Sequence, residues 1–186
     1  MQYRHIFGPV PSRRLGISLG VDLVHHKVCT LDCIYCECGR TTDLTLDRSG
    51  LADPLRIKAE LDHYFSQNDD PDYITFYGSG EPSLNPHLGE IIRYIRTLRP
   101  GVRVAVLTNG TLLFHPDVRN AMLQAHRVIP SLDAADRRTF EQINRPCNGL
   151  EIESVIEGLA AFSSQYEGEL FLEIFILPGV NDHPES

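Results

Sequence analysis

The chain has 186 residues, of which 42% are hydrophobic, and it carries a formal charge of −8 at pH 7. A chain of this length can bury the core of a single domain, and its acidic balance argues against the broad basic surface of nucleic-acid-binding proteins. No apolar stretch approaches the roughly 18 residues that a membrane span needs, and the first residues lack the apolar core of a secretory signal. We therefore expect a cytoplasmic protein without membrane contact, in a reducing compartment that suits free cysteines.

Strand-like and helix-like segments alternate along the chain. Short runs rich in Val, Ile and Leu predict strands, and apolar residues that recur every three or four positions predict helices. In chain order, the pattern predicts a strand over 19–24, a helix over 54–65, a strand over 72–77, a helix over 86–98, a strand over 102–107, a short helix over 116–124, a strand over 127–132, a helix over 150–162 and a long strand over 170–177.

This alternation predicts an α/β fold. Parallel neighbouring strands need crossover connections, and helices on the outside of the sheet provide them. The pattern contains five strand–helix steps, the last of which lacks its helix. The sequence therefore predicts a single domain over 1–186, built on a parallel sheet that ends after its fifth strand.

A cysteine-rich segment, C-T-L-D-C-I-Y-C, follows the first predicted strand and contains Cys29, Cys33 and Cys36. Three thiolates from one short loop can hold three corners of a cubane iron–sulfur cluster and leave the fourth iron without a protein ligand. An iron with a vacant site can react, whereas a fully ligated cluster only carries electrons. The spacing C-x3-C-x2-C, with Tyr35 before the last cysteine, therefore points to chemistry at an open iron.

Other interpretations of the cysteines remain open. A structural zinc site would need a fourth ligand, for which Cys38 and His25 or His26 are candidates. A disulfide framework is disfavoured because the cysteine count, five, is odd and no secretory signal is present. A redox C-x2-C pair would use the last two cysteines of the motif and leave Cys29 unexplained.

Polar and glycine-rich segments follow all five predicted strands. In parallel sheets and barrels, ligands bind at the carboxyl ends of the strands, which share one rim. Any one of these segments alone is a common turn, because Gly, Pro, Asn and Asp are frequent in turns. Together they predict one binding rim. The segments are the cysteine loop, G-S-G-E-P at 78–82, T-N-G at 108–110, S-L-D at 131–133 and P-G-V-N-D at 178–182.

These motifs resemble the radical S-adenosylmethionine (radical SAM) superfamily. The cysteine spacing with its preceding aromatic residue is similar to the signature of that superfamily, and the segment at 78–82 resembles its G-G-E-P motif, with Ser79 in place of the second glycine. The opening G-P-V-P-S-R-R-L-G-I-S-L-G-V-D-L and the later G-R-T-T resemble an uncharacterised branch of iron–sulfur oxidoreductases from bacteria and archaea. The likeness extends from about Phe7 to Asp182.

The resemblance implies a partial (β/α) barrel, a [4Fe-4S] cluster held by Cys29, Cys33 and Cys36, and S-adenosylmethionine chelated to the open iron. One electron from the reduced cluster would break a carbon–sulfur bond and release methionine and a 5′-deoxyadenosyl radical, which takes hydrogen from a substrate. The protein would bind, orient and exclude water. The cofactor contacts implied are close backbone approach at Gly78 and Gly80, Glu81 at the methionine amine, Asn109 and Ser131 near the sulfonium or ribose, Asp133 at a ribose hydroxyl, and Tyr35 against the adenine or the cluster.

The substrate is left open by the resemblance. The acidic balance favours a small molecule, a peptide or a protein over an RNA base, and an electron donor such as flavodoxin or ferredoxin is expected. Two other classes stay open: an iron–sulfur electron carrier or scaffold, and a zinc-stabilised binding module.

Radical SAM cores typically close six strand–helix units, whereas this chain ends after the fifth predicted strand. We therefore expect the domain to be incomplete at its C-terminus. An uncovered sheet edge there favours aggregation, so we expect either a partner that covers this edge or a chain that is less stable than a complete domain.

Overall fold

The computed structural model describes residues 2–49 and 51–182, and its centre is a six-stranded sheet with the strand order β1-β2-β5-β6-β7-β8. The five strands from β2 to β8 pair in parallel, and β1 pairs with β2 in the antiparallel direction. The predicted α/β fold with a parallel sheet is therefore confirmed. The strands are β1 (Ile6–Ser12), β2 (Gly16–Val21), β5 (Tyr73–Phe76), β6 (Arg103–Thr108), β7 (Arg127–Pro130) and β8 (Glu169–Leu170).

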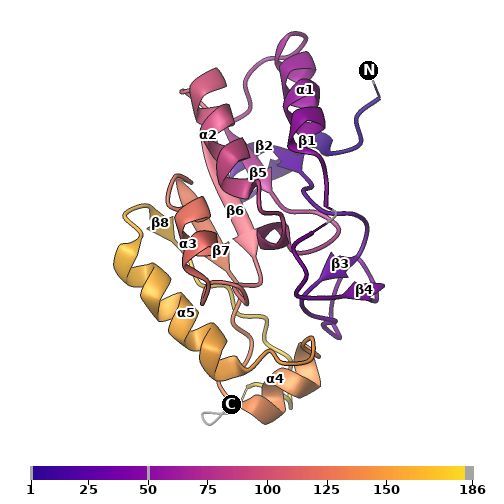
Figure 1. The fold of residues 1–186 in the computed structure, drawn as a ribbon, viewed down its shortest axis with the longest axis vertical. Coiled ribbons are helices and arrows are strands. Elements are labelled where there is room, and N and C mark those ends of the chain that lie inside the picture. The colour runs from indigo at the N-terminus through magenta and orange to yellow at the C-terminus, as the bar shows by residue number, and fades with distance from the viewer. Residues whose placement is uncertain (1, 50, 183–186) are drawn as a thin grey trace.

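Helices connect the parallel strands and follow the sheet along its length, from α1 near β1 and β2 to α5 near β7 and β8 (Figure 1). In the described residues, no helix is both long enough and apolar enough to cross a membrane. The helices are α1 (Pro54–Phe65), α2 (Leu88–Leu98), α3 (Pro116–Met122), α4 (Arg137–Ile143) and α5 (Ile152–Gln165), with a short 3-10 helix η1 (Pro82–Leu84).

The core lies between the sheet and these helices. All four residues of β5 are buried, as expected of a central parallel strand covered on both faces. On α2, four buried apolar residues recur at helical spacing: Leu88, Ile91, Ile92 and Ile95. The side chain of Asp53 accepts a hydrogen bond from the Leu55 N–H and caps α1, whose first residue is Pro54. These helices are close to the predicted ones because periodicity and cap signals agree.

β1 is missing from the predicted elements. It lies at the edge of the sheet and its residues are mostly exposed, so it has no apolar run to indicate a strand. It also contains Pro9 and Pro11, which read as turn signals although an edge strand tolerates proline. The strand predicted over 19–24 begins and ends three residues earlier, as β2. It begins earlier because Gly16 and Ile17 pair with β1, and it ends earlier because the Asp22 side chain accepts from the Val24 N–H in a local turn.

α4 is also absent from the prediction, which leaves 133–149 without a helix. The helix has only seven residues, too few for a periodic pattern, and its clearest signal is the Asp136 side chain, which accepts from the Thr139 N–H at the N-cap.

The long strand predicted over 170–177 is wrong in extent. Only two residues form β8, although the chain continues beside β7: Phe171 N–H donates to the Val128 carbonyl at 3.1 Å and Glu173 N–H to the Pro130 carbonyl at 2.8 Å. The apolar residues beyond β8 are exposed, with exposed fractions of 45–56%. They are Phe171, Leu172, Ile174, Phe175 and Ile176.

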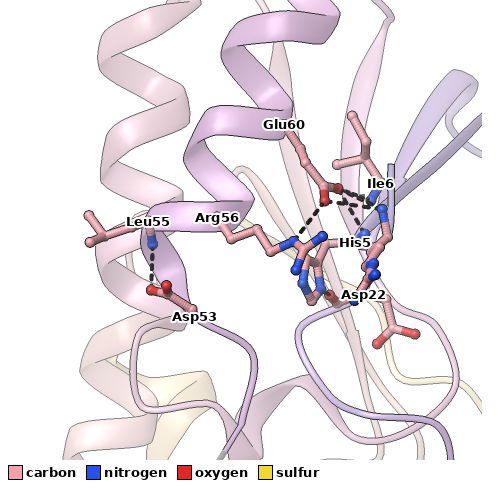
Figure 2. Close-up of polar contacts among 8 residues, drawn as sticks. His5, Ile6, Asp22, Asp53, Leu55, Arg56 and Glu60 are labelled. Atoms are coloured by element: carbon pink, nitrogen blue, oxygen red, sulfur yellow. Dashed lines mark hydrogen bonds and ion pairs between the residues drawn. The ribbon is translucent and has the colours of Figure 1, made fainter. Parts of the chain in front are cut away.

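Glu60 of α1 holds residues 4–6 against this helix. Its side chain is buried, and its carboxylate accepts hydrogen bonds from the backbone N–H groups of Arg4, His5 and Ile6 (Figure 2). Arg56, one turn earlier on α1, forms an ion pair with the same carboxylate at 3.5 Å. One buried acid therefore holds residues 4–6, at the start of β1, against α1.

Candidate functional site

A pocket of about 230 Å³ lies at the carboxyl ends of the central parallel strands. Four of the five predicted strand-end segments contribute to its wall, whereas residues 178–182 do not line it. The expectation that these segments share one rim is therefore met for the first four. All of the predicted site residues line this pocket: Cys29, Cys33, Cys36, Tyr35, Gly78, Gly80, Glu81, Asn109, Ser131 and Asp133.

The cysteine loop leaves a small two-stranded sheet and is tied down in its middle. Cys29 ends β3 (Val28–Cys29), which pairs in parallel with β4 (Asp43–Leu44) apart from the main sheet (Figure 1). Asp32 N–H donates to the Asn144 carbonyl and Ile34 N–H donates to the Ile143 carbonyl, both at 2.9 Å. The loop is therefore attached to the C-terminal end of α4, and this fixes where its cysteines lie.

Each of the three cysteine sulfurs has a nitrogen donor beside it. Asn109 Nδ2 lies 3.6 Å from Cys29 Sγ, and Asn144 Nδ2 lies 3.4 Å from Cys33 Sγ. Lys27 Nζ lies 3.1 Å from Cys36 Sγ. No sequence pattern indicates these roles of Lys27 and Asn144, because the approach of their side chains to the sulfurs depends on how distant segments pack. Donors of this kind orient metal ligands and tune the metal that the ligands hold.

Burial affects the pKa values of Cys29, Cys33 and Lys27. Burial, assisted by the negative charge of Glu81, raises the pKa of the Cys29 thiol to about 12. Burial also raises the pKa of Cys33, against the hydrogen bond from Asn144. Burial by itself would lower the pKa of Lys27, but its hydrogen bond to Cys36 and the charges of the nearby thiolates outweigh that effect and raise it. Metal binding would therefore have to displace thiol protons.

All five cysteines are free, and Cys38 lies exposed at the edge of the same pocket. Over the described part of the chain, no group of three or more His, Cys, Asp and Glu side chains is arranged to hold a metal ion.

Glu81 is fully buried and connects three parts of the rim. Its Oε1 accepts from the Thr108 hydroxyl at 2.6 Å and from the Ser83 N–H at 2.9 Å, and its Oε2 accepts from the Asn109 N–H at 2.7 Å. Burial raises the pKa of Glu81, and these hydrogen bonds oppose the shift. Both carboxylate oxygens are thus engaged by donors of the chain, and the residue joins η1 to the end of β6.

Gly78 and Gly80 are required by close packing within the protein. A Cβ atom at Gly78 would lie 2.4 Å from Asp22 Cγ, and one at Gly80 would lie 2.0 Å from the Val28 carbonyl oxygen. Between them, Ser79 donates to the Asp22 carboxylate through both its N–H, at 2.9 Å, and its hydroxyl, at 2.7 Å. Ser79 is not among the non-glycine residues with positive φ, so a serine at this position is unstrained.

Tyr35 and Asp133 lock the cysteine loop to the C-terminal segment. The Tyr35 hydroxyl donates to Asp133 Oδ2, which also accepts from Asn144 Nδ2 at 2.8 Å. The Tyr35 ring stacks on Phe175, with ring centroids 4.2 Å apart, and Asp133 Oδ1 accepts from the Phe175 N–H at 2.9 Å. Burial and the hydrogen bond to Asp133 raise the pKa of Tyr35. Ser131, the remaining predicted residue, lies in the pocket wall and forms a parallel bridge with Glu173.

Comparison with known proteins identifies the family. Residues 23–185 match the family model described as the radical SAM superfamily. The chain belongs to the radical SAM superfamily. It is 38% identical over 186 residues to a protein named GTPase Obg from Brachyspira hyodysenteriae, covering all of this chain and 27% of that protein. It is 37% identical over 182 residues to a UPF0026 protein from Methanocaldococcus jannaschii, covering 97% of this chain and 56% of that protein.

The fold agrees with the family. The solved structure of native anSMEcpe with bound AdoMet superposes with a TM-score of 0.63 at 18% identity, covering 83% of this chain and 42% of that one. The radical SAM chain thus has a fold similar to that of a radical SAM enzyme, consistent with the expected partial barrel. It spans little more than half the length, or less, of the first curated relatives that it matches.

Proposed function

We propose that this radical SAM chain is an enzyme that binds a [4Fe-4S] cluster through Cys29, Cys33 and Cys36 and uses it to cleave S-adenosylmethionine reductively. The observation that carries the proposal is that these three cysteines line one pocket with the residues of three further strand ends. Membership of the superfamily supports it independently.

The residues fit such a cluster in number and chemistry. Three thiols from one loop can each bind a separate iron of a cubane and leave the fourth iron open. Each sulfur also has a nitrogen donor nearby, from Asn109, Asn144 or Lys27. When bound, the cluster would supply one electron to S-adenosylmethionine, and cleavage would give methionine and a 5′-deoxyadenosyl radical for hydrogen abstraction. The chain itself would orient the thiolates and exclude water.

The remaining pocket residues divide into two roles. We assign Glu81 and Asp133 to holding the rim, because donors of the chain already engage both of their carboxylates. We assign the backbone at Gly78 and Gly80, together with Ser131, to contact with S-adenosylmethionine. Tyr35 and Asn109 would then act mainly by fixing the cysteine loop beside the cofactor, and direct cofactor contact by these two and by the two acids is the less favoured assignment.

The net charge of the chain and the one-electron chemistry are the basis for proposing a class of substrate and a kind of electron donor. A net charge of −8 favours a small molecule, a peptide or a protein as substrate over an RNA base. The single electron would come from a low-potential carrier such as flavodoxin or ferredoxin. A cytoplasmic location is part of the same proposal.

The proposal is tested by anaerobic reconstitution with iron and sulfide, followed by dithionite and S-adenosylmethionine. We expect 5′-deoxyadenosine and methionine in equal amounts, and their loss in each of Cys29→Ala, Cys33→Ala and Cys36→Ala. Cys147→Ala is the matched control, because Cys147 does not line this pocket, and it should keep the activity. Reversible cluster reduction without cleavage would instead support an electron carrier, and colourless protein with stoichiometric zinc would support a binding module.

A further inference from the structure

Lys27 is a buried lysine held in an unusual backbone conformation beside the cysteine loop. Its exposed fraction is 2%, and its φ angle is 57°, a left-handed value that is unfavourable for residues other than glycine. Three backbone hydrogen bonds hold it there: its N–H donates to the Ser79 carbonyl, and its carbonyl accepts from the N–H groups of Thr42 and Asp43, each at 3.1 Å. The chain therefore fixes the direction in which this side chain leaves the backbone.

The ammonium of Lys27 is directed at a cysteine sulfur. Lys27 Nζ lies 3.1 Å from Cys36 Sγ, and no ion pair among the described residues joins Lys27 to a carboxylate. A buried charge is unfavourable unless an opposite charge lies close to it. The partner that the geometry offers is the Cys36 thiolate, the form in which cysteine binds a metal.

The other two cysteines receive a different kind of donor. Cys29 and Cys33 face the neutral side-chain amides of Asn109 and Asn144, at 3.6 and 3.4 Å. Of these three side-chain nitrogens, the Lys27 ammonium lies closest to its sulfur, and it carries a full positive charge whereas the two amides are neutral. The charge distribution around the cluster site is therefore uneven.

We propose that Lys27 is a positioning residue that holds the Cys36 thiolate and raises the reduction potential of the bound cluster. This inference rests on the proposed function, because it takes the three cysteines as the cluster ligands. Reduction adds one negative charge to the cluster, and a nearby cation stabilises the more negative state more strongly. Lys27 would thus make the cluster easier for a low-potential donor to reduce.

The test compares Lys27→Met, which removes the charge, with Lys27→Arg, which keeps it. Each reconstituted protein is titrated anaerobically without S-adenosylmethionine, and the reduced cluster is followed by electron paramagnetic resonance alongside iron and sulfide analysis. We expect Lys27→Met to lower the equilibrium constant for one-electron reduction about tenfold, which is a shift of about 59 mV to more negative potential. Lys27→Arg should stay within about threefold of the unsubstituted protein.

The outcomes separate this inference from the proposed function. If the unsubstituted protein assembles no [4Fe-4S] cluster, the proposed function fails, and this inference fails with it. If it assembles a normal cluster and Lys27→Met has the same potential, the role of Lys27 alone is rejected. Should Lys27→Met lose iron, Lys27→Gln replaces it in the titration. Loss of iron from both neutral variants, with normal iron in Lys27→Arg, would mean that the charge serves cluster assembly, and it would overturn the effect on potential.

Discussion

Removal of the Glu60 carboxylate should destabilise the fold by a measurable amount. This side chain accepts from the N–H groups of Arg4 at 3.0 Å, His5 at 2.8 Å and Ile6 at 3.3 Å (Figure 2). A hydrogen bond to a charged group contributes about 1.5–3 kcal/mol, and an orphaned buried donor costs about 1–3 kcal/mol. In Glu60→Ala, water can reach the exposed Arg4 and the half-buried His5, whereas Ile6 is buried and loses its partner.

We therefore expect Glu60→Ala to lower the free energy of unfolding by about 3 kcal/mol, mostly through the Ile6 N–H. The loss of the Arg56 ion pair should add little, because the Arg56 side chain is 46% exposed. For a chain of this size, about 1 kcal/mol corresponds to roughly 2–4 °C, so the melting temperature should fall by roughly 6–12 °C. Glu60→Gln should fall in between, because it keeps one acceptor oxygen.

The assay is thermal and urea unfolding of the metal-free chain, followed by circular dichroism. Glu157→Ala is the matched control, since Glu157 is an exposed glutamate on α5 and its removal should change stability by no more than about 0.5 kcal/mol. A Glu60→Ala protein that unfolds within about 1 kcal/mol of the unsubstituted chain would refute the reasoning, because the three N–H groups would then have an equally good alternative partner.

Two further predictions concern the pocket. Gly80→Ala places a methyl group against the Val28 carbonyl and should destabilise the metal-free chain by about 1–3 kcal/mol in the same unfolding assay. Gly101→Ala, whose new Cβ meets no atom within 4 Å, is its control; equal stability of the two variants would contradict the packing argument. Because the pKa of Cys29 is raised to about 12, its thiolate fraction is small at pH 8. Its alkylation by iodoacetamide, followed by mass spectrometry, should thus rise about tenfold per pH unit from about pH 8 to about pH 10. A rate that levels off before pH 10 would show an ordinary thiol.

Local sequence signals were sufficient for the central elements and for the outline of the site. The strand β5 is fully buried and β6 is mostly buried, both are rich in apolar residues, and α2 has a buried apolar stripe, so composition and period agree there. The grouping of the strand-end segments around one pocket follows from topology, because the carboxyl ends of parallel strands meet on one rim of the sheet. The sequence could thus place Cys29 and Asp133 in one pocket although they belong to different segments.

The elements that were missed depend on tertiary contacts. β1 forms because β2 offers it an edge and Glu60 holds its start, and neither contact leaves a pattern in residues 6–12. α4 is short, and it is anchored where the cysteine loop binds its last residues. The same limit explains why Asn144 was not recognised: its side chain meets Cys33 across 111 positions of sequence.

Contacts with other segments of the pocket determine the conformation of the cysteine loop more than its own sequence does. At the start of the loop, the Lys27 N–H donates to the Ser79 carbonyl. In its middle, the N–H groups of Asp32 and Ile34 donate to carbonyls at the end of α4, and further along the Tyr35 hydroxyl donates to Asp133. A peptide with only the three-cysteine motif lacks every one of these contacts. Ordering such a peptide around a cluster would therefore cost conformational entropy that the folded chain has already lost. The nitrogen donors beside the sulfurs also come from outside the motif. We therefore expect these donors to distinguish this loop from an isolated cluster-binding peptide.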